Sequence, residues 1–198
     1  KVIFVGDSRT AGMKATLNKQ VSSSVTSDVS FIAKAGQGLS WFQSTGYTQL
    51  INEINKTKGS KPIAVVFNLG INDMANISNY ISYMSDIAST LKSKNCKLFY
   101  MSVNPINSVM ITKAGKGART EAQVREFNSK IRSGLSLNYK YIDTYSVLMK
   151  KGYGTNSSYS GTDAASDDGL HYTTKTFKRI YYYCITYLNT GSIDASIY

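Results

Sequence analysis

The chain has 198 residues, of which 42% are hydrophobic and 18% are charged. This balance predicts one globular domain over residues 1–198 and excludes an intrinsically disordered chain. The 23 Lys and Arg outnumber the 12 Asp and Glu, so the net charge is +11. Such a charge favours anionic surroundings, for example a cell-wall polymer. The basic residues are scattered and form no nucleic-acid-binding motif, so we expect no nucleic-acid partner.

Composition also bears on location, cysteines and metals. No apolar run has the length of a membrane span. The positive charge and a start inside a predicted strand favour an extracellular or cell-surface bacterial domain, with a cytoplasmic location as the alternative. Cys96 and Cys184 lie far apart in the sequence, and His171 is the one histidine. We therefore expect no metal site and two buried free thiols, with a disulfide as the alternative.

The first third of the chain predicts two strands, each followed by a helix. Residues 2–5 form a strand that stops at Gly6-Asp7-Ser8, and a helix follows over about 10–18. Residues 29–33 form a second strand, which leads through a glycine-rich turn into a helix over 41–54. The core contacts expected of this second helix are Trp41, Leu50, Ile51 and Ile54.

The middle of the chain predicts the centre of a sheet. Residues 63–69 are apolar nearly throughout, as in a parallel strand buried on both faces, and they end at Gly70-Ile71-Asn72-Asp73. Apolar residues at helical spacing predict a helix over 77–91. A fourth strand is expected over 98–103, ended by Asn104-Pro105.

The last third begins with a loop rich in Gly and Lys. An amphipathic helix then follows, marked by Val124, Phe127, Ile131 and Leu135. We expect a short strand over 139–142, a long polar loop over 152–169 and a last helix over about 174–188. Five strands alternating with helices predict a three-layer α/β/α sandwich with a mainly parallel sheet. A flavodoxin-like strand order, 2-1-3-4-5, is favoured.

Four polar stretches follow these strands or precede the last helix. Ser8 follows the first strand, residues 36–40 follow the second, and Asn72 follows the third. Because parallel strands share one carboxyl edge, these three stretches are expected to converge there. The long loop then delivers His171, the only imidazole base available to activate a serine. Asp168, three residues before it, is close enough to orient the ring.

This ordered set of stretches resembles the SGNH (GDSL-type) hydrolase superfamily, and the resemblance runs from Gly6 to His171. It implies Ser8 as the nucleophile, His171 as the general base and Asp168 as the acid of a triad. The Asp-x-x-His spacing of the family selects Asp168 over its neighbour Asp167.

The resemblance also implies an oxyanion hole formed by the Ser8 N–H, the Asn72 side-chain amide and a glycine N–H. Gly36 and Gly38 compete for the third position. Gly38 is favoured because the family glycine usually stands two residues before a Ser or Thr, here Ser40. We expect that serine to cap the following helix.

The sequence departs from the family pattern at Arg9 and Tyr172, where leucine and proline are common. An arginine near the pocket would favour a carboxylate or phosphate on the substrate. A surface arginine paired with a neighbouring acid is the favoured alternative. Asp7 and Asp73 are expected to support the loops that carry the catalytic groups.

Together these features predict a serine-dependent acyl-ester hydrolase without a metal or organic cofactor. The small, polar loop over 152–169, with Trp41 and several tyrosines able to stack on sugars, favours an acetyl group on a carbohydrate. The expected partner is a small-molecule or glycan ester. The alternatives are an extracellular O-acetyltransferase of a cell-wall glycan with the same triad, a lipase or thioesterase, and a non-catalytic carbohydrate-binding module.

Overall fold

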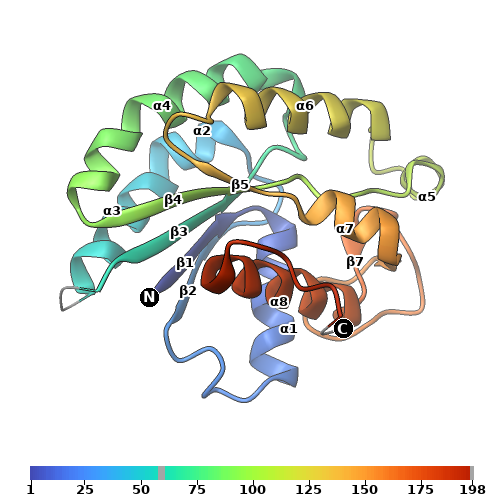
Figure 1. The fold of residues 1–198 in the computed structure, drawn as a ribbon. Helices are drawn as coiled ribbons and strands as arrows, with labels where there is room; N and C mark the ends of the chain where they lie inside the picture. The colour runs from blue at the N-terminus through green and yellow to red at the C-terminus, as the bar shows by residue number, and fades with distance from the viewer. Residues whose placement is uncertain (58–60, 197–198) are drawn as a thin grey trace.

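The computed structural model describes residues 1–57 and 61–196. Five strands form one parallel sheet in the order β2-β1-β3-β4-β5 (Figure 1). The predicted fold class and flavodoxin-like order are therefore confirmed. The strands are β1 (Val2–Gly6), β2 (Val29–Ala33), β3 (Ile63–Asn68), β4 (Cys96–Met101) and β5 (Lys140–Ile142). Two further strands, β6 (Thr155–Asn156) and β7 (His171–Tyr172), pair with each other in an antiparallel manner.

Helices cover both faces of the main sheet (Figure 1). One face carries α2 (Leu39–Trp41), a π-helical turn η1 (Phe42–Gly46), α3 (Tyr47–Lys56), α4 (Ile77–Ser93) and α6 (Glu121–Gly134). The other face carries α1 (Ser8–Gln20), α7 (Thr144–Lys151) and α8 (Thr174–Thr190). A 3-10 turn η2 (Met74–Asn76) and a short helix α5 (Ser108–Lys113) lie in the connections.

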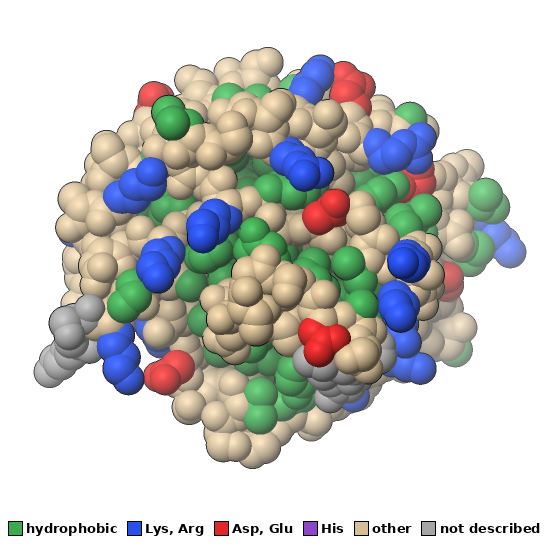
Figure 2. Space-filling model, viewed as in Figure 1, with side chains coloured by type: hydrophobic (Ala, Val, Ile, Leu, Met, Phe, Trp, Pro, Cys, Tyr) green, Lys and Arg blue, Asp and Glu red, His purple; other side chains and the backbone are tan. Residues whose placement is uncertain are grey.

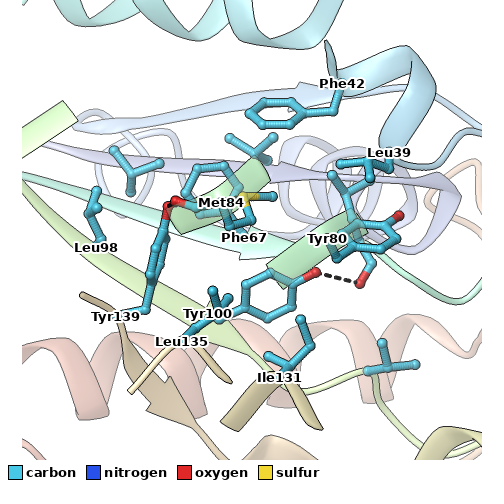
Figure 3. Close-up of a cluster of buried hydrophobic side chains, with 14 of the residues drawn as sticks. Leu39, Phe42, Phe67, Tyr80, Met84, Leu98, Tyr100, Ile131, Leu135 and Tyr139 are labelled. Carbon is cyan, nitrogen blue, oxygen red and sulfur yellow. Dashed lines mark hydrogen bonds between the residues drawn. The ribbon is translucent and has the colours of Figure 1, made fainter. Parts of the chain in front are cut away.

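The sheet separates two hydrophobic clusters. Successive side chains of a strand point to opposite faces, so Phe67 of β3 enters one cluster while its neighbour Val66 enters the other. Figure 3 shows the first cluster, in which Phe67 packs with the rings of Phe42, Tyr100 and Tyr139. The hydroxyl of Tyr100 donates to the Leu69 carbonyl, which satisfies its one buried donor.

Two helices occur where the sequence predicts none. The side chain of Asn107 accepts from Met110 N–H at the start of α5, and Asp143 accepts from Ser146 N–H at the start of α7. Both helices are short, with 6 and 8 residues, and each buries few side chains. They therefore show too little hydrophobic periodicity for detection.

Other boundaries also differ from expectation. The helix predicted over 41–54 is divided by the π-helical turn η1. The fourth strand ends at Met101, because the next residues bind other groups. The N–H and the carbonyl of Val103 both bond to the Asn128 side chain of α6, which draws the chain away from the sheet.

The tryptophan and the cysteines belong to the core. Trp41 is 7% exposed and packs in the first cluster, which confirms the predicted core contact. The prediction that Trp41 stacks on a sugar is wrong, because its ring is buried. Cys96 and Cys184 are buried free thiols in different clusters. The sheet lies between them, which makes the disulfide alternative wrong.

The charged surface matches the scattered basic residues of the sequence. Figure 2 shows Lys and Arg side chains spread over the face viewed, with hydrophobic and uncharged side chains between them. Among the described residues, no helix is long and apolar enough to cross a membrane.

Candidate active site

Ser8 lies at the turn from β1 into α1. Asp7 provides the helix cap, since its Oδ1 accepts from the Arg9 N–H at 2.9 Å. Ser8 is the first helical residue, so its own N–H is one of the terminal donors without a partner inside the helix. Its Oγ is 2.9 Å from Nε2 of His171. The serine therefore contacts the imidazole while its neighbour caps the helix.

His171 lies in β7 and is oriented by Asp168. The distance from His171 Nδ1 to Asp168 Oδ2 is 2.7 Å. The other oxygen of Asp168 accepts the backbone N–H groups of Leu170 and His171, each at 2.9 Å. A carboxylate that holds the Nδ1 proton leaves the Nε2 lone pair directed at the Ser8 hydroxyl. The three predicted residues thus form one hydrogen-bonded series.

The surroundings favour an uncharged imidazole beside a charged carboxylate. Burial lowers the pKa of His171 below the ordinary value of 6.5, and the charges of Arg9 and Lys116 lower it further, against an opposing effect of Asp168. Burial alone would raise the pKa of Asp168, but hydrogen bonds from His171 and Leu170 outweigh it and lower that pKa. At neutral pH the neutral imidazole is therefore able to accept a proton.

Asn72 follows β3, and its amide has a fixed orientation. One N–H of Nδ2 donates to the Gln37 carbonyl at 2.9 Å, and Nη2 of Arg119 donates to Oδ1 at 3.3 Å. Because the Gln37 carbonyl can only accept and the Arg119 guanidinium can only donate, they identify which atom of the Asn72 amide is nitrogen and which is oxygen. The second N–H of the amide is left for another acceptor.

The two candidate glycines lie in different surroundings. A Cβ on Gly38 would lie 2.2 Å from an Asp73 carboxylate oxygen, and the N–H of the next residue, Leu39, donates to that carboxylate at 2.9 Å. Gly36 has a φ of +71°, and a Cβ added there would meet no other atom within 4 Å. Gly38 is therefore held against the segment that carries Asn72. Ser40 is exposed within α2 while Gly38 occupies the cap position, so the expected cap by Ser40 is wrong.

The two supporting aspartates differ in their surroundings. Asp73 accepts from the Tyr80 hydroxyl at 2.6 Å and from the Leu39 N–H, so it joins α4 to the turn before α2. Asp7 is buried, and burial raises its pKa to about 6. Both residues bind the segments that carry Ser8 and Gly38, as expected.

Arg9 is neither a surface residue nor a substrate-facing one, so both interpretations of it are wrong. Its side chain is buried, and Nε donates to the Leu170 carbonyl at 2.8 Å. Its terminal nitrogens donate to the carbonyls of Asn104 and Pro105, at 2.8 and 3.2 Å. The guanidinium also lies 4.8 Å from the centroid of the Tyr172 ring. Arg9 therefore connects α1 to the segment of His171 and to the end of β4.

Two residues of this site, Tyr159 and Arg119, could not be assigned to it from the sequence. The ring of Tyr159 stacks on the imidazole of His171, with 4.5 Å between centroids, and its side chain is 40% exposed. It is the one aromatic residue in a stretch of small residues over 154–166, which is a signal in retrospect. Arg119 lies in an irregular connection, and no pattern in the sequence indicates its contact with Asn72.

A three-layer α/β/α sandwich with Ser, His and Asp bonded in series at the carboxyl edge of the sheet is typical of serine hydrolases. The profile of the GDSL-like Lipase/Acylhydrolase family matches residues 2–183. The chain belongs to this family and is an ester hydrolase. Among the described residues, no group of three His, Cys, Asp or Glu side chains is arranged to hold a metal ion.

Solved structures with this fold have low sequence identity to the chain. A protein of Bacteroides fragilis, assigned provisionally as an acylhydrolase, is 17% identical with a TM-score of 0.68, over 96% of this chain and 86% of that one. An acetyl xylan esterase is 16% identical with a TM-score of 0.60, over 90% and 94% of the two chains. An esterase of Pseudoalteromonas is 13% identical with a TM-score of 0.54, over 96% and 98%. No curated protein gave a significant sequence match.

Proposed function

We propose that the chain is a serine-dependent esterase that removes short acyl groups, in particular acetyl, from a carbohydrate. The observation that carries this proposal is the series Ser8–His171–Asp168. Its two links are 2.9 Å between Oγ and Nε2 and 2.7 Å between Nδ1 and Oδ2. A base placed within hydrogen-bond reach of a hydroxyl, and itself oriented by a carboxylate, is the arrangement that activates serine.

The reaction proceeds in two halves. Ser8 Oγ attacks the ester carbonyl while His171 Nε2 takes its proton, and Asp168 stabilises the imidazolium. The oxyanion accepts hydrogen bonds from the N–H groups of Ser8 and Gly38 and from the free N–H of Asn72. His171 then gives the proton to the leaving alcohol. A water molecule, deprotonated by the same histidine, attacks the acyl-enzyme and releases the acid and Ser8.

The surroundings of Ser8 support a short acyl group. A long acyl chain needs contiguous apolar surface, because each buried CH₂ contributes about 0.8 kcal/mol to binding. The exposed large hydrophobic side chains of the described residues are instead dispersed along the chain, and Tyr159 is the member of that set that stacks on His171. The pocket beside Asn72 is lined by Lys116 and Arg119 of the connection from α5 to α6. An acetyl xylan esterase shares the fold, which supports a carbohydrate as the alcohol.

An extracellular or cell-surface location is part of this proposal. A net charge of +11 attracts the chain to polyanionic wall polymers. Binding of the purified protein to bacterial cell walls, and its release by salt, tests this point.

Aryl esters of graded length test the proposal directly. We expect acetyl esters to be cleaved faster than butanoyl or octanoyl esters, and acetate to be released from acetylated xylo-oligosaccharides. Ser8→Ala should lower kcat by at least about 10³-fold at an unchanged melting temperature. Ser40→Ala removes an exposed serine that caps nothing, so it is the matched control and should retain full activity.

Three outcomes would overturn parts of the proposal. Faster cleavage of octanoyl esters would contradict the short acyl group. Activity that survives in folded Ser8→Ala would contradict the nucleophile. Acetyl groups transferred to an added glycan, without free acetate, would indicate the acetyltransferase.

A further inference from the structure

A surface pocket of about 290 Å³ adjoins Asn72 and has no role in the proposed reaction steps. It lies between the segment that follows β3 and the connection from α5 to α6, and its lining includes Asn72, Asp73, Lys116 and Arg119. We propose that this pocket binds an anionic group of the ester substrate, a carboxylate or a phosphate, with Lys116 and Arg119 as its cations. This inference rests on the proposed function, since it names the substrate class of the same site.

Arg119 is held rigidly with donors to spare. Its Nε donates to the Ile71 carbonyl at 3.0 Å, and its Nη2 donates to Asn72 Oδ1 at 3.3 Å. Its Nη1 donates to the Lys116 carbonyl. A guanidinium carries five N–H groups, so one N–H on each terminal nitrogen is left. Two N–H groups on a fixed, half-buried guanidinium suit the oxygens of a carboxylate or phosphate.

Lys116 supplies a second positive charge that the protein itself does not neutralise. Its side chain is exposed, and no carboxylate of the described residues lies within salt-bridge distance of it. Its charge is also felt at the active site, where it contributes to lowering the pKa of His171. Lys116 is thus close enough to influence the reacting groups.

Asp73 is the one acidic residue among the described residues that line the pocket. Its two oxygens accept hydrogen bonds from the Leu39 N–H and the Tyr80 hydroxyl, so its charge is already solvated by the protein. Two cations against one hydrogen-bonded carboxylate leave the pocket with a positive potential.

The position of the pocket connects anion binding to catalysis. Asn72 lines the pocket, its amide oxygen accepts from Arg119, and its amide nitrogen carries the second N–H that is assigned above to the oxyanion. An anion held by Arg119 and Lys116 therefore places the rest of the substrate within reach of Ser8. We infer a substrate in which the ester lies on the same or the next sugar as a carboxylate or phosphate.

The test compares three acetyl esters. These are an acetylated oligogalacturonide with carboxylates, an acetylated glycerol phosphate with a phosphate, and a neutral acetylated xylo-oligosaccharide. The variants are Lys116→Gln and, as the matched control, Lys113→Gln, which removes an exposed lysine of α5 outside the pocket. Lys116→Gln should lower kcat/KM about fivefold for one of the anionic esters and less than about twofold for the neutral ester. Lys113→Gln should leave all three within about twofold, and added salt should reduce the anionic preference.

The results distinguish this inference from the proposed function. The anionic ester that loses more activity identifies the carboxylate or the phosphate. Equal losses in Lys116→Gln and Lys113→Gln would overturn the pocket in favour of a general effect of surface charge. Equal kcat/KM for the anionic and neutral esters in the unmodified protein would also overturn the pocket. In that case, Ser8-dependent cleavage of a neutral aryl acetate would still support the proposed function. Failure of the proposed function would instead be shown by esterase activity that survives in folded Ser8→Ala.

Discussion

The two sides of the candidate active site are constructed differently. The serine side, defined as Ser8, Gly38 and Asn72, follows directly on three adjacent parallel strands, β1, β2 and β3. The histidine side, defined as residues 152–172, lies outside the main sheet and contains only the two-residue strands β6 and β7. Strand ladders and the hydrophobic core hold the first side. The second side has Leu170 and Tyr172 in the core clusters, but its loop is held by polar contacts.

Those polar contacts are specific. The side chain of Asn156 donates to the Ala164 carbonyl and accepts from the N–H groups of Ser158 and Ala164, which closes the loop on itself. The Asn107 N–H donates to the Gly169 carbonyl, and Arg9 binds the Leu170 carbonyl. Arg9 follows Ser8 in the sequence, so one side chain connects the serine side to the histidine side. Substitutions on either side separate these two kinds of support.

The largest effect is expected from the carboxylate of the histidine side. Asp168→Asn should lower kcat by about 10⁴-fold, because an amide favours the wrong tautomer of His171. Asp167→Asn is the control, since among the described residues that carboxylate accepts from the Gly169 N–H and the Thr155 hydroxyl and not from His171. It should cost less than about tenfold. The measurement is kcat of the two variants with an aryl acetate under steady-state conditions. Equal losses would mean that Asp168 has no special role.

Arg9 should matter most for stability. Arg9→Leu introduces the residue common in the family and removes the Arg9 donors from the carbonyls of Leu170 and Asn104. The Pro105 carbonyl keeps only the Tyr172 hydroxyl among its described donors. We expect the free energy of unfolding to fall by at least about 3 kcal/mol, measured by urea denaturation. Arg9→Lys should be intermediate, because it keeps the charge but not the three-way geometry. Unchanged stability in Arg9→Leu would show that the two sides need no connection.

Asp7 allows a measurement of how much a buried carboxylate beside Ser8 lowers the folding stability. Because its folded pKa of about 6 exceeds the ordinary 3.8, the folded state holds the proton longer, and stability is lost as the pH rises between these values. Asp7→Asn keeps an acceptor for the Arg9 N–H and removes the buried charge. Above pH 6 it should raise the free energy of unfolding by up to about 3 kcal/mol. A variant that is less stable at every pH would contradict this.

Tyr159 should have the smallest effect. Its ring covers His171, and burial lowers the pKa of that imidazole. Tyr159→Ala should therefore shift the acidic limb of the kcat/KM profile to higher pH, toward the ordinary 6.5 of histidine, and lower activity about threefold. Tyr159→Phe keeps the ring and should retain the original profile. An unshifted limb in Tyr159→Ala would show that the ring does not shield the base.

The same contrast explains how much of the molecule could be predicted from sequence. Each strand of the main sheet has a local signal, such as the continuous apolar run before Asn72, and the order of the polar stretches placed Ser8 and Asn72 at one edge. Asp168 and His171 were found through their spacing in the chain. The distance of 2.9 Å between Ser8 Oγ and His171 Nε2 could only come from the structure.

What holds the histidine side could not be predicted, because it has no local pattern. Arg9 binds carbonyls that lie 95, 96 and 161 residues away in the sequence. Backbone carbonyls occur at every residue, so the sequence does not distinguish those three from any others. Arg119 reaches Asn72 from an irregular connection for the same reason. The short helices α5 and α7 depend on single capping side chains.

The most direct test of the central claim is covalent labelling with an alkyl fluorophosphonate, located by mass spectrometry of the intact protein and its peptides. The account predicts one phosphonyl group, on Ser8. Its rate of formation should rise with pH as His171 loses its proton, with a midpoint below the ordinary 6.5, and should be lost in His171→Ala. Labelling of another residue, or labelling of Ser8 at an unchanged rate in folded His171→Ala, would contradict it.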